Sequence, residues 1–217
     1  MPKQVDHQER RRHIGGAVLR LIATRGLEAA SLRNVAAEAG VSMGTVQHYF
    51  TTKQEMLDFA QRYNYERATV RIPRLVEQAP EPRTTRSLLR VLLIDLLGLD
   101  GESREGARLG AAMLAYAVID PQAAATARIA YDGLTGFLAA QLHAAQENSE
   151  LPGHLDTLHA ARHLCAVVEG LCGPILISAC TPDQALAVLD GHLTALFGDA
   201  PGTPPAPAMR PGTAIPG

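Results

Sequence analysis

The chain has 217 residues, of which 47% are hydrophobic, and its formal net charge is −2. This length allows a full hydrophobic core, and the composition of the main body excludes collagen-like, coiled-coil and disordered proteins. Its apolar runs are shorter than the roughly 20 residues that span a bilayer, and the charged amino terminus lacks the apolar segment of a secretory signal, so we expect a cytoplasmic protein without membrane contact.

Helical signals begin with the apolar residues of 14–22, which recur at a spacing of three and four. Gly26 can end this helix in the left-handed conformation. Ser31 and Ser42 are N-cap residues that begin two short helices, and Gly40 separates these helices. The pattern predicts three helices before residue 50.

Thr52 and Glu55 form a capping box that opens a fourth helix, expected to run toward Pro73. Five more helices follow a proline-bearing connector, and no stretch of useful length alternates like a strand. Their expected ranges are 84–99, 103–118, 121–148, 155–179 and 182–197, and their starts are marked by Thr84, Ser103, Pro121, Asp156 and Thr181.

The sequence therefore predicts an all-α fold of about nine helices. We expect a three-helix unit at 1–53 and a larger helical part at 54–198. The tail at 199–217 is rich in Pro and Gly and is expected to be disordered.

The two short helices meet the packing needs of a helix-turn-helix. Ala36 allows the helices to approach, Gly40 permits the turn and Val46 locks the second helix onto the first. Tyr49 and Phe50 are expected to point inward with Val46. The opposite face of the second helix would then enter a DNA major groove.

The residue types on that opposite face suit DNA. Gly44 lowers helix propensity by about 1 kcal/mol relative to Ala, which is reasonable where the backbone must pass close to a phosphate. Thr45 can contact thymine, and Gln47 can pair bidentately with adenine. The predicted DNA-binding residues are Ser31, Arg33, Ser42, Met43, Gly44, Thr45, Gln47, His48, Tyr49 and Lys53.

The distribution of charge along the chain also favours DNA binding by the amino-terminal segment. Residues 1–53 carry eight basic and four acidic side chains, whereas the rest of the chain has an acidic excess. A basic amino-terminal segment on an acidic body suggests a polyanion-binding unit joined to a part with another task.

Nothing in the sequence indicates an enzyme, a cofactor or a metal site. No phosphate-binding loop, dinucleotide fingerprint or nucleophile-base-acid set is present. His159 and His163 have ligand spacing on a helix, but no evident third ligand completes the set. The three cysteines, an odd number in an apolar segment, are expected to be buried free thiols.

The stretch "TRGLEAASLRNVAAEAGVSMGTVQHYFTTKQEML" at 24–57 resembles the DNA-binding domain of the TetR family of bacterial transcriptional regulators. Residues 120–171 are similar to the carboxy-terminal domain of the BetI-like branch. The resemblance implies an all-helical homodimer with a helix-turn-helix DNA-binding domain at 1–53 and a helical effector-binding and dimerisation domain at 54–198. Such a protein is usually a repressor that a small-molecule effector releases from a double-stranded DNA operator. Gln47 departs from the family pattern, which often has an aromatic residue there, so contacts at this position can differ.

The resemblance also implies that the last two helices pair with their mates across a two-fold axis, which predicts a palindromic operator. The alternative is that both helices belong to the core of a single chain. The predicted dimer-interface residues are Gly170, Gly173, Leu186, Leu189, Leu193 and Leu196.

A pocket is expected among the helices at 53–71, 84–118 and 121–179. Its candidate residues are bulky or polar groups on Ala-rich faces, although core packing also explains most of them: Tyr63, Met113, Tyr116, Tyr131, Phe137, Cys165 and Glu169. Asp95 and Glu169 would hold a cationic effector or, as we favour, form internal salt bridges with residues such as Arg90, Arg128 or Arg162.

Two classes of function remain at this point. The first is a dimeric DNA-binding regulator that responds to a ligand. The second is a helical small-molecule-binding protein whose helix-turn-helix does not bind an operator. The outward residues Thr45, Gln47 and His48 and the basic amino-terminal segment favour the first.

Overall fold

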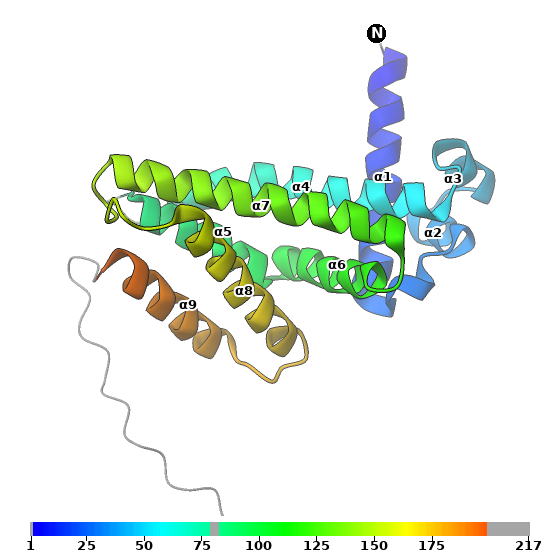
Figure 1. Cartoon of the computed structure of the whole chain (residues 1–217). Helices are drawn as coiled ribbons and strands as arrows, with labels where there is room; N and C mark the ends of the chain where they lie inside the picture. Colours follow the sequence, from blue (N-terminus) through cyan, green and yellow to red (C-terminus); the bar gives the residue numbers. More distant parts are fainter. Residues whose placement is uncertain (1, 79–82, 199–217) are drawn as a thin grey trace, which may run out of the picture.

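The computed structural model describes residues 2–78 and 83–198, which form nine α-helices and one short 3-10 helix without a strand (Figure 1). The helices are α1 (Pro2–Arg25), η1 (Leu27–Ala29), α2 (Leu32–Ala39), α3 (Met43–Tyr49), α4 (Lys53–Gln78), α5 (Thr85–Leu97), α6 (Gly101–Ala117), α7 (Pro121–Glu147), α8 (Thr157–Leu176) and α9 (Pro182–Phe197). The all-α prediction is confirmed, and the predicted disordered tail at 199–217 lies outside the described residues.

Short polar side chains set most helix starts. Ser31, Ser42, Thr84, Asp156 and Thr181 each accept a hydrogen bond from the backbone N–H three residues ahead. Each cap therefore satisfies a backbone donor that has no partner within its own helix.

The start of α6 differs from the prediction. Asp100, not Ser103, is the N-cap residue, and its carboxylate accepts the Ser103 N–H at 2.8 Å. Ser103 occupies the third position of the capping box, and its hydroxyl accepts the Asp100 N–H. The helix therefore begins two residues earlier, because Asp100 offers a stronger acceptor than a hydroxyl.

The helices α1 and α4 are longer than predicted. α1 begins at Pro2 rather than near residue 14, because a polar segment can continue a helix that is anchored further along. α4 continues through Pro73 to Gln78. Pro73 is exposed, so water can hydrate the carbonyl that loses its helical partner.

The capping box at the start of α4 is only half formed. Thr52 Oγ1 accepts the Glu55 N–H at 3.0 Å, as predicted. The Glu55 carboxylate, however, accepts the N–H and hydroxyl of Thr51 at 2.9 and 2.8 Å. The chain before α4 is extended at Phe50, which brings Thr51 within reach of this carboxylate.

Two hydrophobic cores organise the molecule. The first joins α1, α2, α3 and α4, and it includes Leu109 and Met113 of α6. The second joins α5, α7, α8 and α9. α1, α2 and α3 gather at one end, and α4 and α7 run from there along the length of the molecule (Figure 1). α6 therefore connects the amino-terminal helices to the larger helical part.

Close packing of α1 against α4 needs a glycine. A Cβ atom on Gly15 would lie 2.8 Å from the ring of Phe59, which is shorter than real side-chain contacts allow. Within the described ranges, no helix combines the length and apolarity that crossing a membrane requires.

Candidate functional site

The turn between α2 and α3 is fixed by backbone geometry. Gly40 has φ 63° and ψ 34°, the left-handed conformation that glycine adopts without a steric penalty. Its N–H and that of Val41 donate to the last carbonyls of α2, with the Val41 N–H 3.0 Å from the Ala36 oxygen. The turn is thus a standard helix end that directs the chain into α3.

Buried apolar side chains set the rotation of α3. Val46 is 0% exposed and Phe50 is 1% exposed, and both lie in the first core. Tyr49 is half-buried against the same core. The inward positions expected for Val46, Tyr49 and Phe50 are confirmed.

The opposite face of α3 is open to solvent. Met43 is 51% exposed, and Gly44, Gln47 and His48 are exposed as well. Thr45 differs from its neighbours, because it is half-buried and its hydroxyl lies 2.8 Å from the Ser42 hydroxyl. Thr45 therefore already has one local hydrogen-bond partner.

Gly44 has no packing role within the chain. A Cβ atom there would meet only the Ser42 hydroxyl, at the ordinary contact distance of 3.8 Å. Since Ala would fit and favour the helix, the folded chain gives no reason for a glycine at this position.

Two cationic side chains and one capping serine flank the exposed face of α3. Arg33 near the start of α2 and Lys53 at the start of α4 are exposed, and neither forms a hydrogen bond or ion pair with any described residue. Ser31 is exposed too, but its hydroxyl accepts the Asn34 N–H at 3.3 Å. Free guanidinium and ammonium groups beside a helix N-terminus suit phosphate oxygens.

The sequence did not reveal that α1 also reaches this face. The ring of His7 lies 4.6 Å from that of Tyr49 and 6.3 Å from that of His48, measured between ring centroids. The run "HQERRR" at 7–12 shows an excess of positive charge, but nothing in its spacing indicates which residue meets α3.

Arg11 fastens α1 to the chain that enters α4. Its guanidinium lies 5.0 Å from the ring centroid of Phe50 and 4.9 Å from that of Phe59. The same group forms an ion pair with Glu55 at 2.8 Å. Hydrogen bonds from Thr51 lower the pKa of Glu55 further than burial raises it, and Arg11 also contributes. This cluster fixes α4 relative to the helix-turn-helix.

The predicted effector residues do not surround one cavity. Met113 is buried in the first core, whereas Cys165 is buried in the second, 3.6 Å from Thr135 Oγ1. Tyr131 and Phe137 are 37% and 52% exposed on α7. The structure does not gather this set around one cavity, because residues on Ala-rich faces of different helices turn toward different cores or toward solvent. Tyr116 is half-buried in α6.

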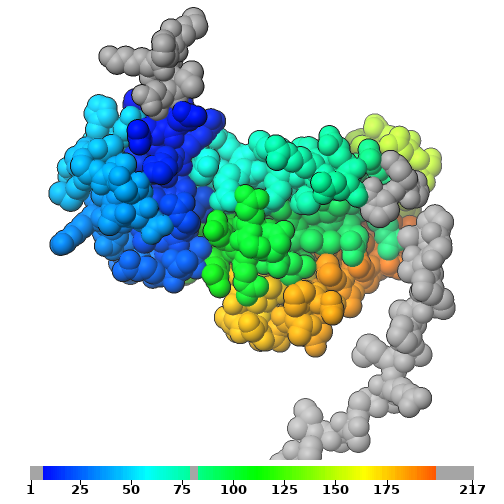
Figure 2. All heavy atoms as spheres, turned by 180° about the vertical axis from the view of Figure 1, so that it is seen from behind, coloured from blue at the N-terminus to red at the C-terminus, as the bar shows by residue number. Residues whose placement is uncertain are grey.

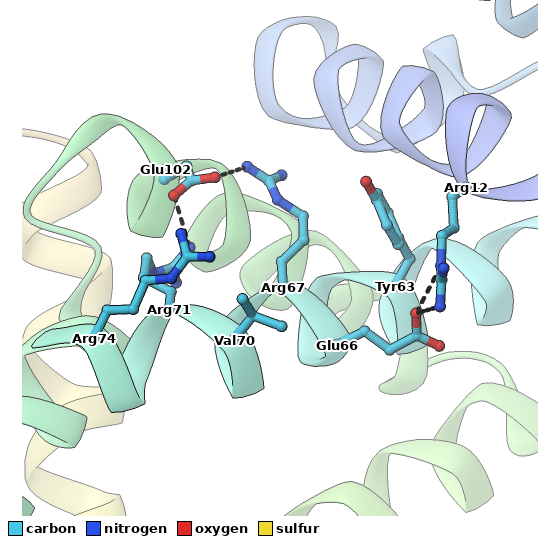
Figure 3. Close-up of a pocket in the computed structure, with 8 residues that line it drawn as sticks. All are labelled: Arg12, Tyr63, Glu66, Arg67, Val70, Arg71, Arg74 and Glu102. Carbon is cyan, nitrogen blue, oxygen red and sulfur yellow. Dashed lines mark hydrogen bonds and ion pairs between the residues drawn. The ribbon is translucent and has the colours of Figure 1, made fainter. Parts of the chain in front are cut away.

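A groove of about 380 Å³ lies instead where α1, α4 and α6 meet. Figure 2 shows the molecule from behind, with the cyan α4 above the green α6 and both helices beside the blue α1. Tyr63 alone among the predicted effector residues lines it. The full lining is Arg12, Tyr63, Glu66, Arg67, Val70, Arg71, Arg74 and Glu102 (Figure 3).

Asp95 and Glu169, the two carboxylates expected in apolar surroundings, lie in different environments. Asp95 forms the internal salt bridge that we favoured, but with Arg71, whose Nε and Nη2 donate at 2.7 and 2.8 Å. Arg90, an expected partner, pairs with Asp190. Glu169 is exposed at the α8 surface, and partial desolvation raises its pKa.

The residues predicted at the dimer interface fall into two groups. Gly170 and Gly173 are exposed on α8, and Leu186 and Leu196 are half-buried on α9. Leu189 and Leu193 are both 0% exposed and belong to the second core. Their assignment to a dimer surface is wrong, because α5 and α8 of the same chain pack on α9.

Cysteine and histidine positions carry no evident chemistry. All three cysteines are free, but only Cys165 is buried, whereas Cys172 and Cys180 are half-buried. Among the described residues, no three His, Cys, Asp or Glu side chains group as a metal site would require. The rings of His163 and His192 lie 5.0 Å apart between α8 and α9.

These features define a helix-turn-helix DNA-binding protein with an additional helical domain. The model of the family described as "Bacterial regulatory proteins, tetR family" matches residues 16–59, and that of the "BetI-type transcriptional repressor, C-terminal" matches residues 85–198. The chain therefore belongs to the TetR family of transcriptional regulators, with an amino-terminal DNA-binding and a carboxy-terminal ligand-binding domain.

Individual relatives agree with this assignment. The HTH-type transcriptional regulator PksA of Bacillus subtilis is 33% identical over 79% of this chain and 80% of its own. A TetR-family regulator from Rhodococcus sp. superimposes with a TM-score of 0.77 at 24% identity, covering 88% of this chain and 99% of that one. AibR, solved with isovaleryl coenzyme A and operator DNA, has a TM-score of 0.60 at 20% identity, covering 87% and 98% of the two chains.

Proposed function

We propose that the protein is a homodimeric repressor that leaves a palindromic operator when a small molecule binds its helical domain. The main support is the orientation of α3. Because Val46 and Phe50 are buried, Gly44, Gln47 and His48 face outward on a helix with no packing need for glycine. Such a regulator would act in the cytoplasm, where operator DNA lies.

Roles for the individual DNA-binding residues follow from their placement. Gln47 would read a base edge, and Gly44 would allow close approach of the backbone to DNA. Arg33, Lys53 and the amides at the starts of α2 and α3, near Ser31 and Ser42, would hold phosphates. Met43, Thr45, His48 and Tyr49 would complete the contact surface.

The proposed dimer uses the exposed faces of α8 and α9, which lie side by side (Figure 1). Small or apolar exposed residues recur at helical spacing along one face of each helix. They are Ala166, Gly170 and Gly173 on α8, with Ile177 directly after it, and Val188, Gly191 and Ala195 on α9. Ile177 is 77% exposed in the single chain, which is costly for a large apolar side chain beside other apolar groups.

Control by an effector requires that the two parts of the chain have different tasks and are mechanically connected. We assign DNA binding to 1–53 and effector binding and dimerisation to 54–198. α4 leads directly from α3 into the larger part, so a ligand that favours another tilt of α4 would change the spacing of the two recognition helices. AibR illustrates that this fold accommodates both a ligand and operator DNA.

The test is selection of random duplex DNA on the purified protein, followed by titration of the selected duplex at several salt concentrations. A palindrome bound by two copies, with an affinity that falls steeply with salt, is the expected result. Failure to enrich any sequence with a folded, dimeric protein would contradict the proposal and favour a ligand-binding protein without an operator.

A further inference from the structure

The groove between α1, α4 and α6 has the size of a small-molecule site, at about 380 Å³. One ion pair lies at each end of it (Figure 3). Arg12 and Glu66 pair at 3.2 Å at one end, and Glu102 meets arginines of α4 at the other. Tyr63 and Val70 lie between them and supply an apolar surface.

Guanidinium groups outnumber carboxylates among the residues that line the groove. Four guanidinium groups face two carboxylates, those of Glu66 and Glu102. Arg71 is held in place by the bidentate pair with Asp95, whose side chain is only 4% exposed. Arg74 forms neither an ion pair nor a hydrogen bond within the described part of the chain, so its guanidinium is available.

Glu102 occupies the position that an oxyanion would take. Its two oxygens lie 2.7 Å from Arg67 Nη2 and 3.6 Å from Arg71 Nη1. The hydrogen bond from Arg67 is the largest influence on the Glu102 carboxyl and holds its pKa below the usual range. The Glu102 side chain is nevertheless 57% exposed, and ion pairs of that exposure add little net stability. Its carboxylate can therefore be exchanged for another anion.

We propose that this groove binds a small organic anion whose carboxylate or phosphate replaces Glu102 between Arg67 and Arg71. Arg74 adds a further charge, and a short apolar tail packs on Val70 and Tyr63. Planar guanidinium groups recognise both kinds of oxyanion, and those of Arg67 and Arg71 are already placed by Glu105 and Asp95.

A ligand bound in this groove would act as an effector, an inference that rests on the proposed function. Glu102 belongs to the first turn of α6, and Arg67 and Arg71 belong to α4. An anion that replaces Glu102 removes one link between these helices. Because α4 follows directly from α3, the loss of this link would allow the helix-turn-helix to shift.

Isothermal titration calorimetry without DNA tests the site independently of operator binding. Four six-carbon probes differ mainly in the head group: hexanoate, hexyl phosphate, hexylammonium and hexan-1-ol. Heat from one or both anions, with none from the alcohol or the cation, is the expected result. Comparison of hexanoate with hexyl phosphate separates a carboxylate ligand from a phosphate ligand.

Variants assign any binding to the groove. Arg74→Ala should weaken binding of the anionic probe about five- to tenfold, since a charge-assisted contact is lost. Glu102→Gln should tighten it, because the competing carboxylate loses its charge. Arg128→Ala, which removes an exposed arginine of α7 outside the groove, should leave it unchanged.

Three outcomes would overturn the proposal: no heat from either anion at millimolar concentration, preference for hexylammonium, or equal weakening by Arg74→Ala and Arg128→Ala. None of them affects operator selection, which does not involve the probes. Conversely, a protein that binds anions but enriches no DNA sequence would retain the site and lose the regulatory role.

Discussion

Gly44 shows how a single residue can separate folding from DNA binding. Its position is exposed, helical and free of internal contacts, so Gly44→Ala should raise the free energy of unfolding by about 0.5 to 1 kcal/mol. The added methyl group should weaken operator binding by about 1 to 3 kcal/mol, as in an overpacked contact. Urea unfolding and operator titration measure the two effects, and unchanged operator affinity would show that no close approach occurs here.

Gln47 and Lys53 should differ in what they contribute to binding. Gln47→Ala should cost about 1 to 3 kcal/mol, mainly at one base pair of the operator, because an amide can pair bidentately with adenine. Lys53→Ala should weaken specific and random duplexes alike and reduce the salt slope by about one unit. Titration of single-base operator variants measures both. Equal loss on operator and random DNA would remove the base-reading role of Gln47.

At the scale of helices, ion pairs of different burial join α4 to its neighbours. Asp95→Asn should lower the free energy of unfolding by about 3 kcal/mol, because Arg71 then keeps a charge in a mostly buried place without its main partner. Glu102→Gln, which alters an exposed partner of the same arginine, should cost less than about 1 kcal/mol. Urea unfolding at a fixed protein concentration measures both, and similar losses would refute the distinction.

Local signals predicted the helices better than the contacts between them. Ser31, Ser42 and Thr181 could be identified as caps because capping depends on residues three positions apart. The partner of Asp95 could not be predicted, because Arg71 lies 24 residues earlier on another helix and meets it only through packing. The outward face of α3 could likewise be identified because it depends on local spacing. The contact of His7 on α1 with Tyr49 could not, because it depends on how the helices pack.

At the scale of the whole molecule, periodicity identifies an apolar helix face but not what covers it. Leu189 and Leu193 share α9 with the exposed Val188 and Gly191, and only the fold shows which face meets α5 and α8. The predicted effector residues are dispersed for a similar reason, since two separate cores divide side chains that the sequence placed together. The surface left for a partner is therefore narrower than the sequence suggested.

Dimerisation through that surface can be tested with a matched pair of glycines. Gly170 on α8 and Gly136 on α7 are both exposed, and a Cβ atom on either would meet no other group within 4 Å. Arg favours a helix over Gly, so neither Gly170→Arg nor Gly136→Arg should destabilise the single chain. Gly170→Arg places a charged side chain in the proposed interface, whereas Gly136→Arg adds the same charge away from it.

Analytical ultracentrifugation should therefore show a monomer for Gly170→Arg and a dimer for Gly136→Arg at the same micromolar concentration, with equal helix content by circular dichroism. Operator affinity should fall steeply for Gly170→Arg, because one monomer covers only one half-site. A Gly170→Arg protein that remains dimeric and binds the operator normally would place the two-fold interface elsewhere. In that case the exposed small and apolar residues on α8 and α9 would need another explanation.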